Sequence, residues 1–482
     1  MHTPGGGGVR SSAGWFVNWV RSTSYLKKWI VLGTAIGMIA GLGAALFLTM
    51  LMGASHLLLE TIGGYSPPSA AGEGGGAGTG VTRPWALPLI VGLGGLVAGF
   101  IVYRWAPEAE GHGTDAAIEA VNKDPRMIRG RVVVIKLIAS AITIGSGGSA
   151  GREGPTAQIS AGFGSLLARR LDLSPADGRI AVAIGIGSGI GAIFGAPLGG
   201  AVLCGAIVYK NDFEFDAIVP GLFASIVSYA VYGTFFGFEP LFGYVGAEYR
   251  LDDPLHLIWY ALIGVFAGLL GILYARSFYF TVAVTKRLPG ARALRPAVGG
   301  VLVGLMAIAI PQVLGSGYGW VQQGLSREAL LALPLWIVLV LPVAKIVATS
   351  LTVGTGGSGG VFGPGLVIGA FTGAALWRLL EPIAPGVPDS PAPFVIVGMM
   401  ACFGSIGRVP LAVMLMVAEM TGGITILAPA MAAVAVAYFI VRSSGDTIYR
   451  SQAENREAAQ RMRASSDEPR DQRDDAHRQK GE

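Results

Sequence analysis

Charge, histidine and cysteine are all scarce in this sequence of 482 residues. Charged residues make up 13% of the chain, about half of the share that is usual for a soluble domain. The five histidines are scattered, and no His, Cys and carboxylate cluster has the spacing of metal ligands. Cys204 and Cys402 both lie in apolar segments, which argues against a disulfide framework. We therefore expect no metal, no cofactor and no covalent chemistry, and we do not expect an enzyme.

Hydrophobic residues, in contrast, make up 52% of the chain, and the mean hydropathy is +0.58. Apolar segments recur along the sequence, for example at residues 29–54, 84–103, 257–275 and 393–403. Several reach the roughly 20 residues that a helix needs to cross the hydrocarbon core of a bilayer. The sequence therefore predicts an all-α polytopic membrane protein with about a dozen or more hydrophobic segments, whose surroundings are a lipid bilayer.

The net charge is +5, but the sequence contains no stripe of basic residues interleaved with aromatic ones. We therefore expect no nucleic-acid partner. Lys27 and Lys28, together with Arg10 and Arg21, precede the first apolar run, which is too long for a signal peptide. By the positive-inside rule this places the N-terminus in the cytoplasm.

Three parts of the chain do not read as membrane segments. The first is a polar lead of residues 1–24, and the second is a flexible Gly/Pro-rich loop of residues 64–83. The third is a charged tail of residues 451–482, which opens with helical propensity and is then expected to be disordered. The membrane domain is therefore predicted to cover residues 25–450.

Internal repetition is the most informative feature of the sequence. Residues 136–155 align with residues 345–364 at a constant offset of 209, with 10 of 20 positions identical. A second pair is anchored by Pro197 and Pro410. Shared glycine content could produce such a match by chance, but the lysine, threonine and proline positions match as well, which favours duplication. The predicted halves are residues 26–236 and 254–441.

Both copies of the repeat contain a glycine-rich loop that interrupts an apolar run and ends in Gly-Pro, at Pro155 and at Pro364. Proline suits the first turn of a helix, so a new helix is predicted to begin near each proline. The free N–H groups at these helix starts, with the helix dipoles behind them, form an anion site at the interface of the repeats. A phosphate-binding loop is the rival interpretation, but the GxxxxGK[ST] pattern is absent.

Four motifs carry a resemblance to a known family. They are "GREGP" (151–155), "GGVFGP" (359–364), "GHGTDAAIEAV" (111–121, where the family usually has GSGIPE) and "PLAVMLMVAEMTGG" (410–423). The sequence thus resembles the CLC family of chloride channels and Cl⁻/H⁺ antiporters over roughly residues 26–455. The resemblance implies two inverted repeats whose broken half-helices meet at a midplane anion site. It also implies a homodimer with one pore per subunit, and we expect a bacterial inner-membrane protein with both termini in the cytoplasm.

The resemblance also implies roles for individual residues. Glu153 matches the gating glutamate, whose carboxylate competes with the anion; the alternative is a structural ion pair with Arg152. Tyr449 matches a tyrosine that reaches the ion from the inner side, or else it is an ordinary interfacial tyrosine. Val361 and Phe362 match positions whose backbone N–H groups bind chloride. The full set of expected anion-binding residues is His112, Gly113, Gly151, Arg152, Glu153, Gly154, Val361, Phe362 and Tyr449.

One departure from the family concerns the inner gate, where His112 stands in place of a serine. Its imidazole either faces the anion path, where its charge would titrate near neutrality, or points away and leaves only backbone on the path. Thr114 and Asp115 replace the usual Ile-Pro, and Asp115 is a candidate helix cap.

The second departure concerns proton coupling. The internal glutamate of the family's antiporters corresponds to Ala206, which cannot carry a proton. The pseudo-symmetric position holds Glu419, to which the family analogy gives a structural role, while Glu214 and Asp216 are expected a turn or more away in a loop. A passive or weakly coupled chloride channel is therefore favoured. The alternatives are an antiporter with another proton route, which would also bind protons, and a transporter of fluoride or nitrate.

Overall fold

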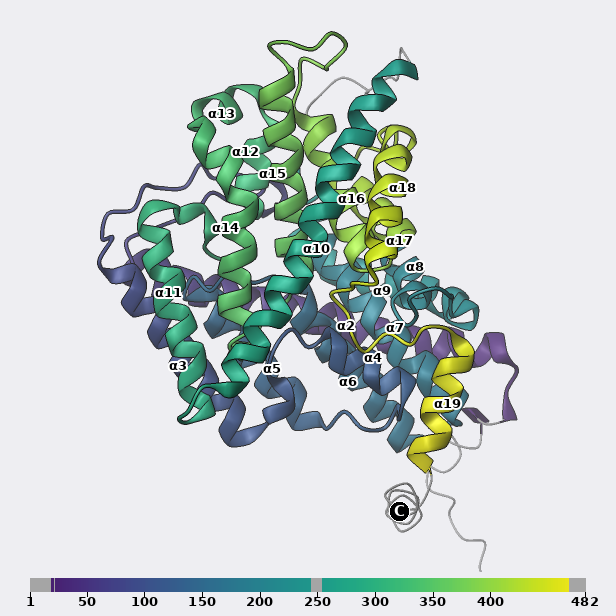
Figure 1. The fold of residues 1–482 in the computed structure, drawn as a ribbon. Coiled ribbons are helices and arrows are strands. Elements are labelled where there is room, and N and C mark those ends of the chain that lie inside the picture. The colour runs from purple at the N-terminus through teal and green to yellow at the C-terminus, as the bar shows by residue number, and fades with distance from the viewer. Residues whose placement is uncertain (1–18, 21, 244–253, 468–482) are drawn as a thin grey trace, which may run out of the picture.

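A computed structural model describes residues 19–20, 22–243 and 254–467 of the chain (Figure 1). Within these residues, nine helical segments are long and apolar enough to cross a membrane, and three shorter apolar helices accompany them. The nine are Tyr25–Ile62 (α2 with η1), Ala86–Trp105 (α3), Pro175–Phe194 (α7), Phe215–Phe236 (η4 with α9), Leu257–Arg287 (α10), Arg292–Ala309 (η6 with α11), Leu335–Val353 (α14), Phe362–Leu380 (α15) and Leu427–Ser444 (α18).

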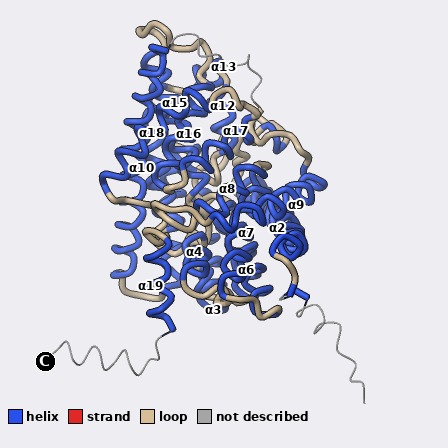
Figure 2. Tube along the Cα trace, turned by 90° about the vertical axis from the view of Figure 1, so that its right-hand side faces the viewer, coloured by secondary structure: helices blue, strands red, loops and turns tan. Residues whose placement is uncertain are grey.

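The remaining α-helices have 18 residues or fewer. They are Thr114–Asn122 (α4), Gly130–Gly145 (α5), Glu153–Arg170 (α6), Pro197–Ala206 (α8), Tyr318–Leu325 (α12), Arg327–Ala332 (α13), Ala392–Ile406 (α16), Pro410–Thr421 (α17) and Arg456–Asp467 (α19). The described parts of the chain contain helices and loops with three isolated β-bridges and no named strand (Figure 2). The predicted all-α membrane fold is confirmed.

The order of helices repeats along the chain, so that each helix of the first half has a counterpart in the second. The pairs are α2 with α10, α3 with α11, α4 with α12, α5 with α14, α6 with α15, α7 with α16, α8 with α17 and α9 with α18. Contacts between the two halves show the same pairing of equivalent residues. The hydroxyls of Ser149 and Thr349 are 3.0 Å apart, and those of Ser140 and Ser358, their counterparts at an offset of 209, are 2.9 Å apart. Such an exchange of partners is what a two-fold relation between the halves produces.

Two buried lysines, Lys136 on α5 and Lys345 on α14, hold equivalent turns in the two halves. The Nζ of Lys136 donates to two carbonyls of the turn before α4, at 2.6 and 3.1 Å. The Nζ of Lys345 donates to two carbonyls of the turn before α12, at 2.8 and 3.0 Å. Each turn ends in an N-cap glycine with positive φ, Gly113 (81°) and Gly317 (84°), where a side chain would be strained. The lysines thus fix where α4 and α12 begin.

The described part of the predicted tail is anchored rather than free. Its first residues pair with the loop after α8: the N–H of Ala453 donates to the carbonyl of Val208 (3.2 Å), and the N–H of Lys210 donates to that of Ala453 (2.9 Å). The helix α19 follows at the lower end of the molecule, whereas α12 and α13 lie at the upper end (Figures 1 and 2). The predicted helical start of the tail is confirmed, and residues 468–482, like the lead residues 1–18, lie outside the described residues.

Candidate anion site

Four helix N-termini lie around one place inside the bundle. Helix α6 begins at Glu153, α12 at Tyr318 and α15 at Phe362, while α4 begins directly after Gly113. The first N–H groups of a helix have no partner within that helix, and the dipole makes this end attractive to anions. The helices α6 and α15 start two residues before the predicted prolines, so the prediction of a break followed by a new helix is confirmed.

The carboxylate of Glu153 lies at the N-terminus of α15. Its Oε1 accepts a hydrogen bond from the N–H of Gly363 at 2.7 Å, and its Oε2 accepts one from the Tyr318 hydroxyl at 3.2 Å. The residue is fully buried. Glycines make room for it, because a Cβ added at Gly151 or Gly360 would lie 2.0 or 2.4 Å from Glu153 Oε1. The Glu153 carboxylate therefore occupies a small site that is lined by glycines and in which N–H and O–H donors converge. We call this place the candidate anion seat.

Arg152 does not use its neighbour Glu153 as its main partner. Its guanidinium, which is 3% exposed, forms an ion pair with Glu73 from the loop of residues 64–83, and it lies 5.0 Å over the ring of Tyr318. Two cavities of about 300 and 590 Å³ are both lined by Arg152 and Glu73. The loop that the sequence marks as flexible thus supplies the counter-charge of Arg152, beside Glu153.

The other predicted residues lie around the same place. The carbonyl of Val361 accepts a hydrogen bond from the Tyr274 hydroxyl at 2.9 Å, and the ring of Phe362 lies 4.1 Å from that of Phe403. The backbone of His112 abuts Gly154, where an added Cβ would lie 2.3 Å from the His112 carbonyl oxygen. The sequence motifs, which are far apart in the chain, are therefore brought together by the fold.

Tyr449 lies on the other side of this cluster, close to His112. Its side chain is completely buried, with ring centroids 5.8 Å from His112 and 6.1 Å from Phe403. This complete burial does not fit the alternative of an interfacial tyrosine. The Tyr449 hydroxyl lies near Thr114, yet within the described residues it has no hydrogen-bond partner of normal geometry, and neither has Nδ1 of His112.

The predicted cap role of Asp115 is wrong, because the N-terminus of α4 has no side-chain cap. Asp115 Oδ1 instead accepts a hydrogen bond from the N–H of Ser451 at 3.1 Å, and Oδ2 lies 3.3 Å from Nε2 of His112. The imidazole of His112 is buried, at 6% exposure, and its polar atoms need hydrogen-bond partners. Asp115 therefore pairs with His112 rather than with the N–H groups at the start of α4.

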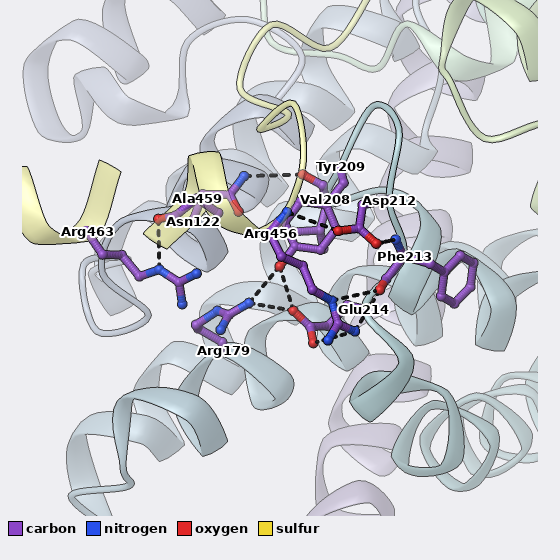
Figure 3. A network of polar contacts seen from close by, with 10 residues as sticks. All are labelled: Asn122, Arg179, Val208, Tyr209, Asp212, Phe213, Glu214, Arg456, Ala459 and Arg463. Carbon is purple, nitrogen blue, oxygen red and sulfur yellow. Dashed lines mark hydrogen bonds and ion pairs between the residues drawn. The ribbon is translucent and has the colours of Figure 1, made fainter. Parts of the chain in front are cut away.

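Glu214 lies closer to the internal position than the sequence indicates. It is in a loop, as expected, but that loop folds back so that its N–H donates to the carbonyl of Gly205, next to Ala206, at 3.0 Å. The expected separation of a turn or more is therefore wrong. Its carboxylate forms ion pairs with Arg179 and, at 3.6 Å, with Arg456 of α19, as Figure 3 shows.

Tyr209 completes this cluster, and its hydroxyl lies 2.7 Å from Glu214 Oε2. Burial, together with the carboxylate beside it, raises the pKa of Tyr209 to about 12, so the phenol remains a hydrogen-bond donor at neutral pH. Two guanidinium groups and a phenol thus surround the Glu214 carboxylate.

Glu419 has the structural position that the sequence suggests. Its two carboxylate oxygens accept hydrogen bonds from the N–H groups of Leu198 (3.0 Å) and Gly199 (2.7 Å) in the first turn of α8. A carboxylate at this place satisfies two donors that the helix itself leaves free. Glu419 thus fastens α17 to the start of α8.

Sequence reasoning missed Tyr318, which donates to the candidate gate. A signal for it exists: "GSG" at residues 315–317 repeats "GHG" at residues 111–113, each before a short helix. The repeat therefore places Ser316 at the equivalent of His112, and Tyr318 at the start of the helix equivalent to α4. Glu73 carries no such signal, because its role depends on a contact between distant segments.

Broken helices that point their N-termini at a buried carboxylate, within a bundle of membrane-spanning helices, define an anion-transport protein. Residues 94–442 match the voltage gated chloride channel family, and the chain belongs to this family, the CLC proteins. A ClcB-like protein of Ralstonia nicotianae is 31% identical over 399 residues, which cover 79% of this chain and 89% of that protein.

Further relatives carry names of exchangers. The H⁺/Cl⁻ exchange transporter ClcA of Yersinia pestis is 28% identical over 72% of each chain. Among solved structures, a slow cyanobacterial Cl⁻/H⁺ antiporter has a TM-score of 0.74 at 23% identity and covers 88% of this chain and 96% of its own. A CLC-type fluoride/proton antiporter has a TM-score of 0.74 at 20% identity, with 90% and 100% covered. These two structures share the fold.

Proposed function

We propose that this member of the CLC family conducts chloride through the site around Glu153 and that Glu153 is the gate. The observation that carries the proposal is the position of the Glu153 carboxylate, which accepts hydrogen bonds from Gly363 and Tyr318 where a halide would also be attracted. A carboxylate and an anion compete for such a seat. Protonation removes the charge of the carboxylate and so favours the anion.

We further propose that chloride movement is passive or weakly coupled to protons. Ala206 cannot titrate, and the carboxylate of Glu214, whose N–H bonds to the carbonyl of the neighbouring Gly205, is paired with Arg179 and Arg456 (Figure 3). The geometry around position 206 therefore supports a gate at Glu153 without an inner proton relay at this place.

Exchange of chloride for protons is the competing function, since the relatives named ClcA are H⁺/Cl⁻ exchange transporters. Purified protein in chloride-loaded liposomes separates the two. A chloride gradient is imposed at equal pH on both sides, the voltage is clamped at the proton equilibrium potential, and the movements of chloride and protons are recorded. Chloride efflux without proton movement is expected, whereas uphill proton movement driven by chloride would overturn the channel proposal and require a proton route independent of Ala206.

Selectivity is tested in the same liposomes with fluoride and nitrate in place of chloride. We expect chloride to be carried at least as fast as either ion. A family marker for nitrate, proline at position 112, is replaced by histidine in this chain. Faster fluoride or nitrate flux would reassign the substrate while leaving the Glu153 gate in place.

We also propose that the end of the molecule with α19 faces the bacterial cytoplasm. The start of α2 lies at this end, where Lys28 pairs with Asp177 at the start of α7. Lys123, Arg169, Arg170 and other basic residues occupy the neighbouring loops and helix ends, as the positive-inside rule requires. Modification of introduced cysteines from outside the cell tests this orientation.

A homodimer is proposed as the assembled form. Helices α8 and α17, with 10 and 12 residues, are too short to span about 30 Å of hydrocarbon. Their exposed residues Leu198 (46%) and Leu411 (57%) offer an apolar face to a second copy. Cross-linking through cysteines introduced at these two positions is expected to give dimers in membranes, and purely monomeric protein would contradict the proposal.

A further inference from the structure

His112, which is buried, and Asp115, whose side chain is 23% exposed, form a pair at the end of the anion path that lies opposite to Arg152. Asp115 is acceptor-only when ionised, so the Nε2 of His112, 3.3 Å away, carries the proton between them. The Tyr279 hydroxyl lies 3.3 Å from the same oxygen of Asp115, but its single proton has a closer acceptor, the carbonyl of Ile448 at 2.8 Å. The imidazole is thus the clearest donor to this oxygen.

This arrangement fixes what the second ring nitrogen can do. In a neutral imidazole with its proton on Nε2, Nδ1 is an acceptor that presents a lone pair and would repel an anion. In the doubly protonated ring, Nδ1 becomes a charged N–H donor. Nδ1 of His112 is buried and has no hydrogen-bond partner within the described residues, and the hydroxyl of the neighbouring Tyr449, although it lies near Thr114, has none of normal geometry. Two polar atoms on adjacent rings are therefore available to one small ligand.

We propose that His112 and Asp115 make the inner anion site dependent on a proton, so that a halide is bound by Nδ1 of His112 and the Tyr449 hydroxyl when the imidazole is doubly protonated. The inference rests on the proposed function, because the halide is the transported anion. It adds a second proton-dependent element to the path, one in which the proton and the anion bind together.

The charged and titratable groups around the pair are compatible with this role. On the ring's own segment Glu110 precedes it, and from α5 Lys136 reaches the carbonyl of Gly111. From the C-terminal segment Tyr449 faces the ring, and Arg450 lies 3.5 Å over the ring of Tyr279 on α10. Glu153, at the start of α6, is next to Gly154, against which the His112 carbonyl lies. Asp115 is the acidic group in direct contact with the imidazole.

The test uses the purified full-length protein with Glu153→Gln, in which the gating carboxylate no longer titrates. Chloride binding is measured by calorimetry at about pH 5 and about pH 8, the limits of the range in which imidazole ordinarily titrates. We expect roughly tenfold tighter binding at the lower pH, the gain from one charge-assisted hydrogen bond. Adding His112→Ser should make the chloride affinities at the two pH values equal. Adding Asp115→Asn should shift the increase in chloride affinity to lower pH.

His56→Ser is the matched control, because His56 also pairs with a carboxylate, Glu60, at 3.0 Å but is exposed. It should retain the tenfold difference. A second readout is the ¹⁵N spectrum of the five histidines. The resonance that His112→Ser removes belongs to His112. Chloride should raise the titration midpoint of this resonance, because the effects of proton and anion on each other's binding are reciprocal.

Equal chloride affinity at both pH values in Glu153→Gln overturns the inference and leaves the Glu153 gate intact. A pH dependence that survives His112→Ser also overturns it. Absence of any chloride binding in the unsubstituted protein and in Glu153→Gln would remove the proposed function together with this inference.

Discussion

Gly151 and Gly360 exchange two backbone hydrogen bonds, with N to O distances of 2.8 and 2.6 Å, although 209 residues separate them. They are the same position of the two repeats, so a residue is here paired with its own counterpart. Such a reciprocal pair lies on the two-fold axis that relates the halves. Both glycines also border the carboxylate of Glu153, so the centre of symmetry is also the wall of the candidate anion seat.

Gly151→Ala should damage this seat directly. The added methyl group would lie 2.0 to 2.5 Å from the three atoms of the Glu153 carboxylate group, closer than any stable contact. The methyl group would fill the space that the carboxylate or a competing chloride occupies, so we expect chloride affinity near neutral pH to fall roughly tenfold or more, about 1.4 kcal/mol. Calorimetry on the purified variant measures this. Gly130→Ala, at a helix start with open space around it, should bind chloride normally; an unchanged affinity in Gly151→Ala would argue against the seat.

Glu153→Gln should remove the closed state of the gate. The amide has no charge with which to compete for the N-terminus of α15, so chloride flux near neutral pH is expected to rise by roughly tenfold, and any proton movement should stop. Flux from liposomes measures both. Glu328→Gln, on the exposed face of α13, serves as the control. Persistent proton movement in Glu153→Gln would show that protons take a path without this residue.

Glu73→Gln should destabilise the protein, because Arg152 is buried and loses its counter-charge. The expected loss is roughly 1–3 kcal/mol, reduced from the value for a fully buried pair because Glu73 is partly exposed. Thermal unfolding in detergent, followed by tryptophan fluorescence, measures the shift. Glu239→Gln changes a carboxylate that lines the same cavity, and it should unfold close to the unsubstituted protein. Equal behaviour of the two variants would mean that the Arg152 pair contributes nothing.

Arg456→Gln should loosen the attachment of α19. Arg456 donates two hydrogen bonds to the carbonyl of Phe213, at 2.8 and 3.2 Å, besides its contact with Glu214 (Figure 3). Loss of these bonds, worth roughly 1–2 kcal/mol, should speed hydrogen exchange of the Lys210 amide about tenfold. Arg461→Gln is the control, because its pair with Glu457 is exposed and long, at 3.9 Å. Similar exchange in the two variants would contradict this anchoring role.

Much of the candidate site can be predicted from the sequence because it depends on local sequence patterns. A glycine-rich interruption followed by Gly-Pro specifies a break and a helix start wherever it occurs, so the starts of α6 and α15 follow from residues 145–155 and 354–364. Hydrophobic length specifies membrane helices. The offset of 209 specifies that the two breaks are equivalent.

The tertiary structure decided which charges meet. Asp115 pairs with His112 and Ser451 rather than capping α4, Glu214 folds back beside Ala206, and Glu73 crosses from a remote loop to Arg152. Each contact joins segments by packing. A buried polar group takes whichever partner the fold brings within about 3 Å. Sequence therefore determined where the helices break and which residues line the breaks, while only the packing of the two halves determined the partner of each buried charge.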